Sequence, residues 1–111
     1  MNNAIYPLFP CPLMICAREY AFSESEREFL ASLEFANNTG NSMSTDDQVL
    51  DRDELKPLRQ FIEEQIAIYA RNLLSIRSDN EIYITQSWIN RSGEGEFHPK
   101  HKHPNRVVSG D

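Results

Sequence analysis

The chain has 111 residues, a net charge of −6 at pH 7, and 40% hydrophobic and 25% charged residues. This length allows one domain with a modest core, because domains typically span about 100–150 residues. The negative charge makes nucleic acid an unlikely partner, since binding it requires a basic surface. No apolar run approaches the roughly 20 residues of a membrane span, and the N-terminus lacks the basic start of a secretory signal. We therefore expect one cytoplasmic domain without a membrane partner.

Residues 5–16 are apolar and interrupted by prolines. Proline lacks the N–H that a central strand donates, so this stretch predicts an edge strand or an extended segment laid over the body. Cys11 and Cys16 are the only cysteines. We interpret them as free thiols in a reducing compartment, with a disulfide as the alternative.

A short helix is predicted after residue 22. Ser23 with Glu26, or Ser25 with Glu28, fits a capping box, in which each side chain satisfies a backbone N–H of the first turn. An apolar stripe at helical spacing follows. It consists of Phe29, Leu30 and Leu33.

Residues 36–48 contain many turn-forming residues and no periodicity, which predicts a loop. Val49 and Leu50 are expected to anchor the end of this loop to the core.

The strongest helical pattern runs from about Leu55 to Leu74, with Pro57 in the first turn, where a missing N–H costs least. Its apolar residues recur every three or four positions, which is typical of one buried helix face. They are Leu55, Leu58, Ile62, Ile66, Tyr69 and Leu73.

Residues 81–90 are rich in β-branched and aromatic residues and alternate in character, which predicts a strand. Gly93 and Gly95 indicate a turn, and Val107 and Val108 are expected to begin another strand.

All three histidines, His98, His101 and His103, lie within six residues. His98 and His103 precede prolines, which favour extended backbone. In an extended chain His101 and His103 point to the same face with Cα atoms roughly 6–7 Å apart, so both imidazoles can reach one metal. His98 would face the opposite side unless the chain turns at Pro99, which makes it a second-rank candidate.

Imidazole suits iron, zinc, copper or nickel. The alternatives to a metal site are a solvated basic loop and a phosphate-binding patch. The segment forms a basic island on the acidic chain, and such an island could attract a small anion. Its cations are Arg91, Lys100, Lys102 and Arg106, against Glu94 and Glu96.

Several segments, taken in order, resemble phage and marine bacterial 2-oxoglutarate- and Fe(II)-dependent oxygenases. The resemblance rests mainly on residues 86–90, which hold the tryptophan, then on the glycine turn and His segment of residues 95–105, and then on Ser109-Gly110. Upstream, residues 8–13 resemble the opening segment of the family. Residues 40–42 and 46–50, and the helix at Phe61-Ile62, also fit, so the resemblance covers nearly the whole chain.

The resemblance implies an α+β fold: the N-terminal part of a double-stranded β-helix, the cupin-type jelly roll, with two helices packed outside the sheet. It implies an oxidoreductase of dioxygenase type that uses Fe(II) and 2-oxoglutarate, releases succinate and hydroxylates a substrate. That substrate is a protein side chain, a nucleobase or a small metabolite. His101 and His103 match the family's H-x-H positions, and the compartment would be the host cytoplasm if a phage encodes the chain.

The chain also departs from the family. Classical members of the wider superfamily have an acidic residue where His103 stands, and Arg106 replaces a usual serine. The distal metal histidine and the basic residue that pairs with 2-oxoglutarate would follow Asp111. We therefore expect residues 1–111 to be a truncated, inactive oxygenase domain with a partial metal site and no catalytic residue of its own. The alternative is a small non-catalytic binding module that self-associates through an exposed sheet edge.

Overall fold

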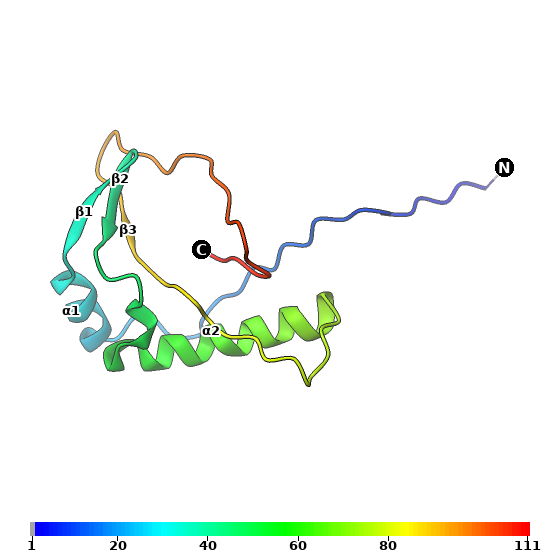
Figure 1. The fold of residues 1–111 in the computed structure, drawn as a ribbon, viewed down its shortest axis with the longest axis horizontal. Coiled ribbons are helices and arrows are strands. Elements are labelled where there is room, and N and C mark those ends of the chain that lie inside the picture. Colours follow the sequence, from blue (N-terminus) through cyan, green and yellow to red (C-terminus); the bar gives the residue numbers. More distant parts are fainter. Residues whose placement is uncertain (1) are drawn as a thin grey trace.

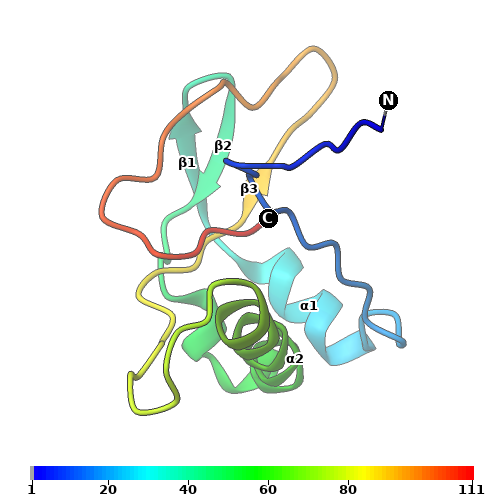
Figure 2. The same ribbon diagram turned by 90° about the vertical axis from the view of Figure 1, so that its right-hand side faces the viewer.

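The computed structural model describes residues 2–111 and has an α+β fold. Two helices, α1 (Glu24–Ser32) and α2 (Lys56–Ile68), accompany a three-stranded antiparallel sheet. The strands are β1 (Phe35–Asn38), β2 (Asn41–Ser44) and β3 (Asn90–Arg91), in the order β1-β2-β3. Both helices lie at one end of the sheet (Figures 1 and 2).

The predicted capping box begins α1 and is confirmed at Ser23 and Glu26. The Ser23 Oγ accepts the Glu26 N–H at 3.1 Å, and Glu26 Oε1 accepts the Ser23 N–H at 2.9 Å. This pair satisfies two N–H groups that the first turn of a helix leaves free. The helix therefore starts at Glu24, and the alternative box at Ser25 is not used.

The loop predicted over residues 36–48 was wrong, because most of it is the β1–β2 hairpin. Asn38 pairs with Asn41 across the two-residue turn Thr39-Gly40, and Gly40 has φ of 80°, which glycine adopts without strain. The strands are polar, so alternation of apolar residues could not reveal them. Their buried polar side chains instead find partners from residues 87–97, which come much later in the chain.

The long helix was predicted correctly in position and nearly in length. Leu55 closes a 3-10 turn (Asp53–Leu55) and is fully buried; α2 begins at the next residue, with Pro57 in its first turn. After Ile68 the helix widens into a π-helical turn, Tyr69–Leu73. The predicted region 55–74 is therefore helical almost throughout.

The strand predicted over residues 81–90 was wrong in extent, because only Asn90 belongs to one. The preceding residues run extended past α2, with Ile82 and Ile84 half-buried and Tyr83 exposed. Half-buried and exposed side chains therefore alternate along these residues, as in a strand. Their backbone, however, pairs with another segment only at a single parallel bridge between Gln48 and Ser87. Residues 107–108 likewise form no strand.

The core is small and lies between the two helices and the end of the sheet. Val49, Leu50 and Leu55 are its buried centre, so Val49 and Leu50 belong to the core as predicted, although the segment that they anchor is mostly a hairpin. Half-buried residues from both helices and from the extended segment pack around them: Phe29, Leu30, Leu33, Leu58, Ile62, Ile84 and Ile89. Within residues 2–111, no helix is long and apolar enough to cross a lipid bilayer.

Candidate metal centre

The histidine segment is held on the turn of the β1–β2 hairpin. The Phe97 N–H donates to the Gly40 carbonyl at 2.8 Å, and the Asn41 side-chain amide donates to the Phe97 carbonyl at 3.0 Å. Asn41 is buried, and its Oδ1 accepts from the Asn38 amide at 3.0 Å. These bonds fix the backbone where the histidine segment begins, although the segment itself is irregular.

His101 and His103 point their rings at each other. Their Nε2 atoms are 2.8 Å apart, and the ring centroids are 4.5 Å apart with an interplanar angle of 77°. The His101 Nδ1 lies 2.9 Å from the Pro99 carbonyl oxygen. A carbonyl oxygen can only accept, so Nδ1 of His101 carries the hydrogen and its neutral Nε2 presents a lone pair.

This arrangement fits two ligands of one metal ion. Metal–nitrogen distances of about 2.0–2.1 Å place two ligands at right angles about 2.8–3.0 Å apart, which matches the Nε2–Nε2 separation. A ligand histidine commonly donates its other ring N–H to a backbone carbonyl, as His101 does to Pro99. Without a metal, the His103 Nε2–H must donate to the lone pair on Nε2 of His101. Metal binding through Nε2 of His103 therefore requires this proton to move to its Nδ1.

His98 lies beside the pair but has other partners. Its ring centroid is 4.6 Å from that of His101, so the chain does turn at Pro99 and brings the third imidazole near. Its Nδ1, however, faces the amide nitrogens of Asn41 and Asn90 at 3.3 and 3.5 Å. Amide nitrogens only donate, so Nδ1 accepts and a neutral His98 carries its hydrogen on Nε2. The side chain therefore ties the segment to the sheet.

A cavity of about 370 Å³ adjoins this segment. Trp88 forms part of its wall, and its ring lies 6.4 Å from that of His103 at an angle of 33°. The cavity gives a small molecule room beside His98, whereas His101 and His103 are not among its lining residues. Its other lining residues are Ile89, Asn90, Ser92, His98 and Asp111.

The described part of the chain, residues 2–111, brings no group of three or more histidine, cysteine or acidic side chains together as a metal site. Cys11 and Cys16 are free and exposed in the N-terminal segment. A metal ion held by His101 and His103 would therefore need further ligands from solvent, a small molecule or other protein residues.

The basic island is only partly available to an anion. The Arg91 guanidinium lies over the Phe35 ring at 4.1 Å, and Arg106 donates to the Gln86 side chain at 2.5 Å. Lys100 and Lys102 are exposed on either side of His101. These two lysines are the cations best placed to attract an anionic molecule to the histidine pair.

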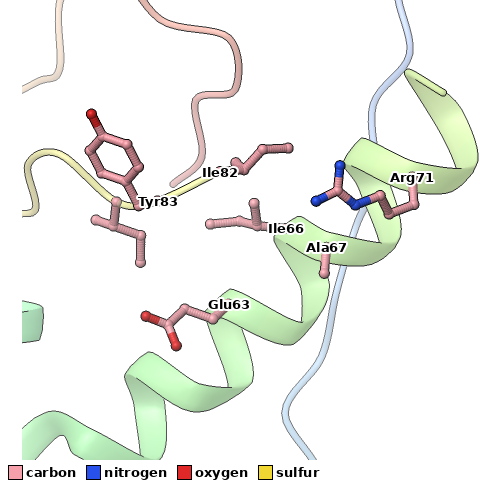
Figure 3. Close-up of a pocket in the computed structure, with 7 residues that line it drawn as sticks. Glu63, Ile66, Ala67, Arg71, Ile82 and Tyr83 are labelled. Atoms are coloured by element: carbon pink, nitrogen blue, oxygen red, sulfur yellow. The ribbon is translucent and has the colours of Figure 1, made fainter. Parts of the chain in front are cut away.

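A second cavity, of about 70 Å³, lies between α2 and the extended segment (Figure 3). Glu63 and Ile66 line it from the helix, and Ile82 lines it from the extended segment, where the Tyr83 ring points away from the helix. The Arg71 guanidinium at its edge donates to the backbone carbonyls of residues 76, 77 and 80 and so holds the turn after the helix. The volume suits one or two water molecules, each of which occupies about 30 Å³ in the liquid.

The carboxyl groups with clearly shifted pKa values stabilise the fold. The Arg18 guanidinium, and then the Ser23 N–H, lower the pKa of Glu26. Arg52, and then the Gln48 N–H, lower the pKa of Asp46 at the start of a 3-10 turn. Glu26 pairs with Arg18 in the first turn of α1, and Asp46 pairs with Arg52 across the 3-10 turn Val49–Asp51.

Sequence reasoning missed Asn41 as a residue of the site, because it lay in a predicted loop. Its role depends on contacts with Phe97 and His98, more than 50 positions later, and no local pattern predicts them.

The chain matches no protein-family model, no curated protein and no solved structure.

Proposed function

We propose that residues 1–111 are the N-terminal part of a 2-oxoglutarate- and Fe(II)-dependent oxygenase of hydroxylase type. In this proposal the three-stranded sheet is one portion of a double-stranded β-helix. His101 and His103 are two of the iron ligands, and His98 is a supporting residue.

The histidine pair is the observation that carries the proposal. The exposed His101 and the half-buried His103 have Nε2 atoms 2.8 Å apart, which is the spacing of neighbouring ligands, and the Pro99 carbonyl presets the tautomer of His101. Sequence resemblance adds the order of the tryptophan, glycine turn and H-x-H segments. With O2 as the oxidant, bound iron would supply the oxidative decarboxylation of 2-oxoglutarate to succinate and CO2, in which one oxygen atom enters succinate and the other hydroxylates the substrate.

The chain's own residues would bind and orient the reactants. His101 and His103 hold the metal, and the Trp88 ring lies 6.4 Å from that of His103. Lys100 and Lys102 raise the local positive potential, which favours the approach of a dicarboxylate. Asn41 holds the segment in register with the hairpin, so the two imidazoles keep their separation.

The proposal requires a third protein ligand and a basic residue for the 2-oxoglutarate carboxylate, supplied by residues outside this chain. We therefore expect the purified 111-residue chain to bind a divalent metal weakly and to produce no succinate. Succinate formation that needs Fe(II) and disappears in His101→Ala would refute the partial-site proposal.

The first experiment tests the metal pair with Co²⁺, followed by paramagnetic broadening in NMR spectra of the labelled chain. His101→Ala and His103→Ala are each expected to weaken binding at least about 10-fold, the loss typical for a disturbed metal site. His98→Ala removes only the supporting residue and should weaken binding less than either pair variant. Equal Co²⁺ affinity in the wild type and in both pair variants would overturn the assignment.

The second experiment tests the link to 2-oxoglutarate. This compound can chelate a metal through its 2-oxo and carboxylate oxygens, whereas glutarate lacks the 2-oxo group. We expect 2-oxoglutarate to strengthen Co²⁺ binding to the wild-type chain and glutarate to leave it unchanged. An equal effect of both compounds would count against an oxygenase site.

The competing function is a small non-catalytic binding module. It is favoured by one observation, that residues 2–111 gather only two ligands at the histidine segment. Such a module would bind the metal without any response to 2-oxoglutarate. The glutarate comparison therefore separates the two functions.

A further inference from the structure

The N-terminal arm, residues 2–17, is the largest apolar feature that the fold leaves uncovered. It contains no Asp, Glu, Lys, Arg or His. It leads away from the helices and the sheet (Figure 1). Six of its large apolar side chains are 75–96% exposed: Ile5, Tyr6, Leu8, Phe9, Leu13 and Ile15. Contiguous exposed apolar surface of this kind marks an interaction site.

The root of the arm is fastened to the body, which sets the direction of the rest. The Tyr69 hydroxyl donates to the Pro12 carbonyl at 3.0 Å. Arg18 forms two bonds with the Glu26 carboxylate, at 2.9 and 3.2 Å. The prolines at positions 7, 10 and 12 restrict the backbone and remove N–H donors. Docking such an arm therefore costs less conformational entropy than docking a flexible tail.

We propose that two copies of this chain exchange their arms. Each arm packs on the C-terminal end of α2 and its π-helical turn in the other copy, where the side chains of Ile68 and Leu73 are 46% and 51% exposed. One chain thus supplies both the arm and the surface that receives it, as a closed symmetric dimer requires. Because the arm is uncharged, it can approach a body of net charge −6 without repulsion.

The apolar area is sufficient for a stable dimer. Each large side chain presents roughly 100–150 Å², so the four that lie beyond the Pro12 contact present roughly 400–600 Å² per arm. Two arms supply roughly 800–1,200 Å², and the surface that they cover adds a similar area, so the total reaches the roughly 1,200–2,000 Å² that stable interfaces bury. The arm lacks the Lys and Arg residues that accompany apolar side chains in membrane-surface segments, which favours a protein partner.

Sedimentation velocity on the full 111-residue chain tests the exchange. We expect a species of twice the 12.9 kDa chain mass at micromolar concentration. Phe9→Asp in the arm and Ile68→Glu on the receiving surface should each raise the dimer Kd at least about 30-fold, as loss of a buried aromatic or aliphatic anchor does. Asn3→Asp is the control, because it adds the same charge to the arm at a polar position, and far-UV circular dichroism checks that each variant folds.

Mixing the two variants distinguishes exchange from other contacts. A Phe9→Asp chain keeps an intact receiving surface, and an Ile68→Glu chain keeps an intact arm, so the mixed pair regains one of the two contacts. We expect the mixture to dimerise at least about 5-fold more tightly than either variant alone, since an anchor contact carries much of the binding energy. No gain on mixing would overturn the proposal.

Other outcomes would also overturn it. One is a wild-type chain that stays monomeric up to about 200 µM, which is weaker than a specific interface. The others are an open-ended polymer and a monomer whose arm binds neutral phosphatidylcholine vesicles. The inference does not rest on the proposed oxygenase function. Its variants leave His101 and His103 unchanged, so the metal and exchange experiments can fail independently.

Discussion

Replacing Glu26 tests the N-terminal fastening of the fold. Its carboxylate is buried and serves two purposes: it accepts the Ser23 N–H in the capping box and forms a two-bond ion pair with Arg18. Glu26→Gln retains the shape and an acceptor for Ser23 but removes the charge that pairs with Arg18. Glu26→Ala removes both interactions.

The expected losses follow from this geometry. Breaking a fully buried ion pair costs about 3–5 kcal/mol, and the Arg18 side chain is 16% exposed, so we expect about 2 kcal/mol for Glu26→Gln. Loss of the cap adds about 1 kcal/mol for Glu26→Ala. Urea unfolding followed by Trp88 fluorescence measures both. With a slope of about 1.5 kcal/mol per molar urea, Glu26→Gln should lower the midpoint by roughly 1.3 M.

The pH dependence gives a second readout. The pKa of Glu26 is lowered from its ordinary 4.5 in the folded protein, first by Arg18 and then by the Ser23 N–H. A carboxyl with a lowered folded-state pKa contributes stability that is complete above the unfolded value and is lost as the pH falls through the folded value. The difference between wild type and Glu26→Gln should therefore be constant from pH 7 to about pH 5 and shrink below that.

The control is Glu28→Gln, which removes an exposed charge from the same helix and should change the unfolding free energy by less than about 0.5 kcal/mol. The reasoning is refuted if Glu26→Gln is no less stable than Glu28→Gln, or if its deficit persists unchanged at pH 2.

Three further variants test the core and the support of the histidine segment by the same urea assay. Leu55→Ala, at the fully buried centre of the core, should cost about 2–5 kcal/mol and leave little folded protein; a loss below 1 kcal/mol would contradict the assigned core. Gly40→Ala should cost at least about 2 kcal/mol, because the backbone has φ of 80° and a Cβ would lie 2.6 Å from the Phe97 carbonyl oxygen; an unchanged midpoint would contradict this turn. Ser87→Ala should cost about 1–2 kcal/mol, since its Oγ accepts the Leu50 N–H at 3.0 Å; no loss would show that this bond is dispensable.

Local patterns in the sequence determined the helical part of this protein. The capping box at Ser23 and Glu26 and the stripe along α2 depend on residues three or four positions apart, so the chain encodes them without reference to the rest of the fold. The same holds for the roles of Val49 and Leu50 as anchors. Their apolar character after a long polar stretch has one stable outcome, which is burial.

Contacts between distant segments decided the sheet. The hairpin strands are polar, and local partners satisfy only part of the hydrogen-bonding capacity of the buried Asn41 and Ser44. Phe97, His98 and Ile89 supply the remaining partners from distant parts of the chain. The extended segment over residues 81–89 has strand-like composition, yet a strand exists only where a neighbour completes its ladder. Composition alone could identify neither outcome.

The histidine segment depends both on local sequence patterns and on contacts between distant segments. The i, i+2 spacing of His101 and His103, with prolines nearby, was enough to predict that the two rings share a face. The folded backbone places the Pro99 carbonyl against His101, two residues away, and so sets its tautomer. The tertiary structure decided the position of His98, because Asn41 and Asn90 draw it to the sheet. A spacing along the chain is a local property, whereas Asn41 can meet His98 only after two distant segments have been brought together.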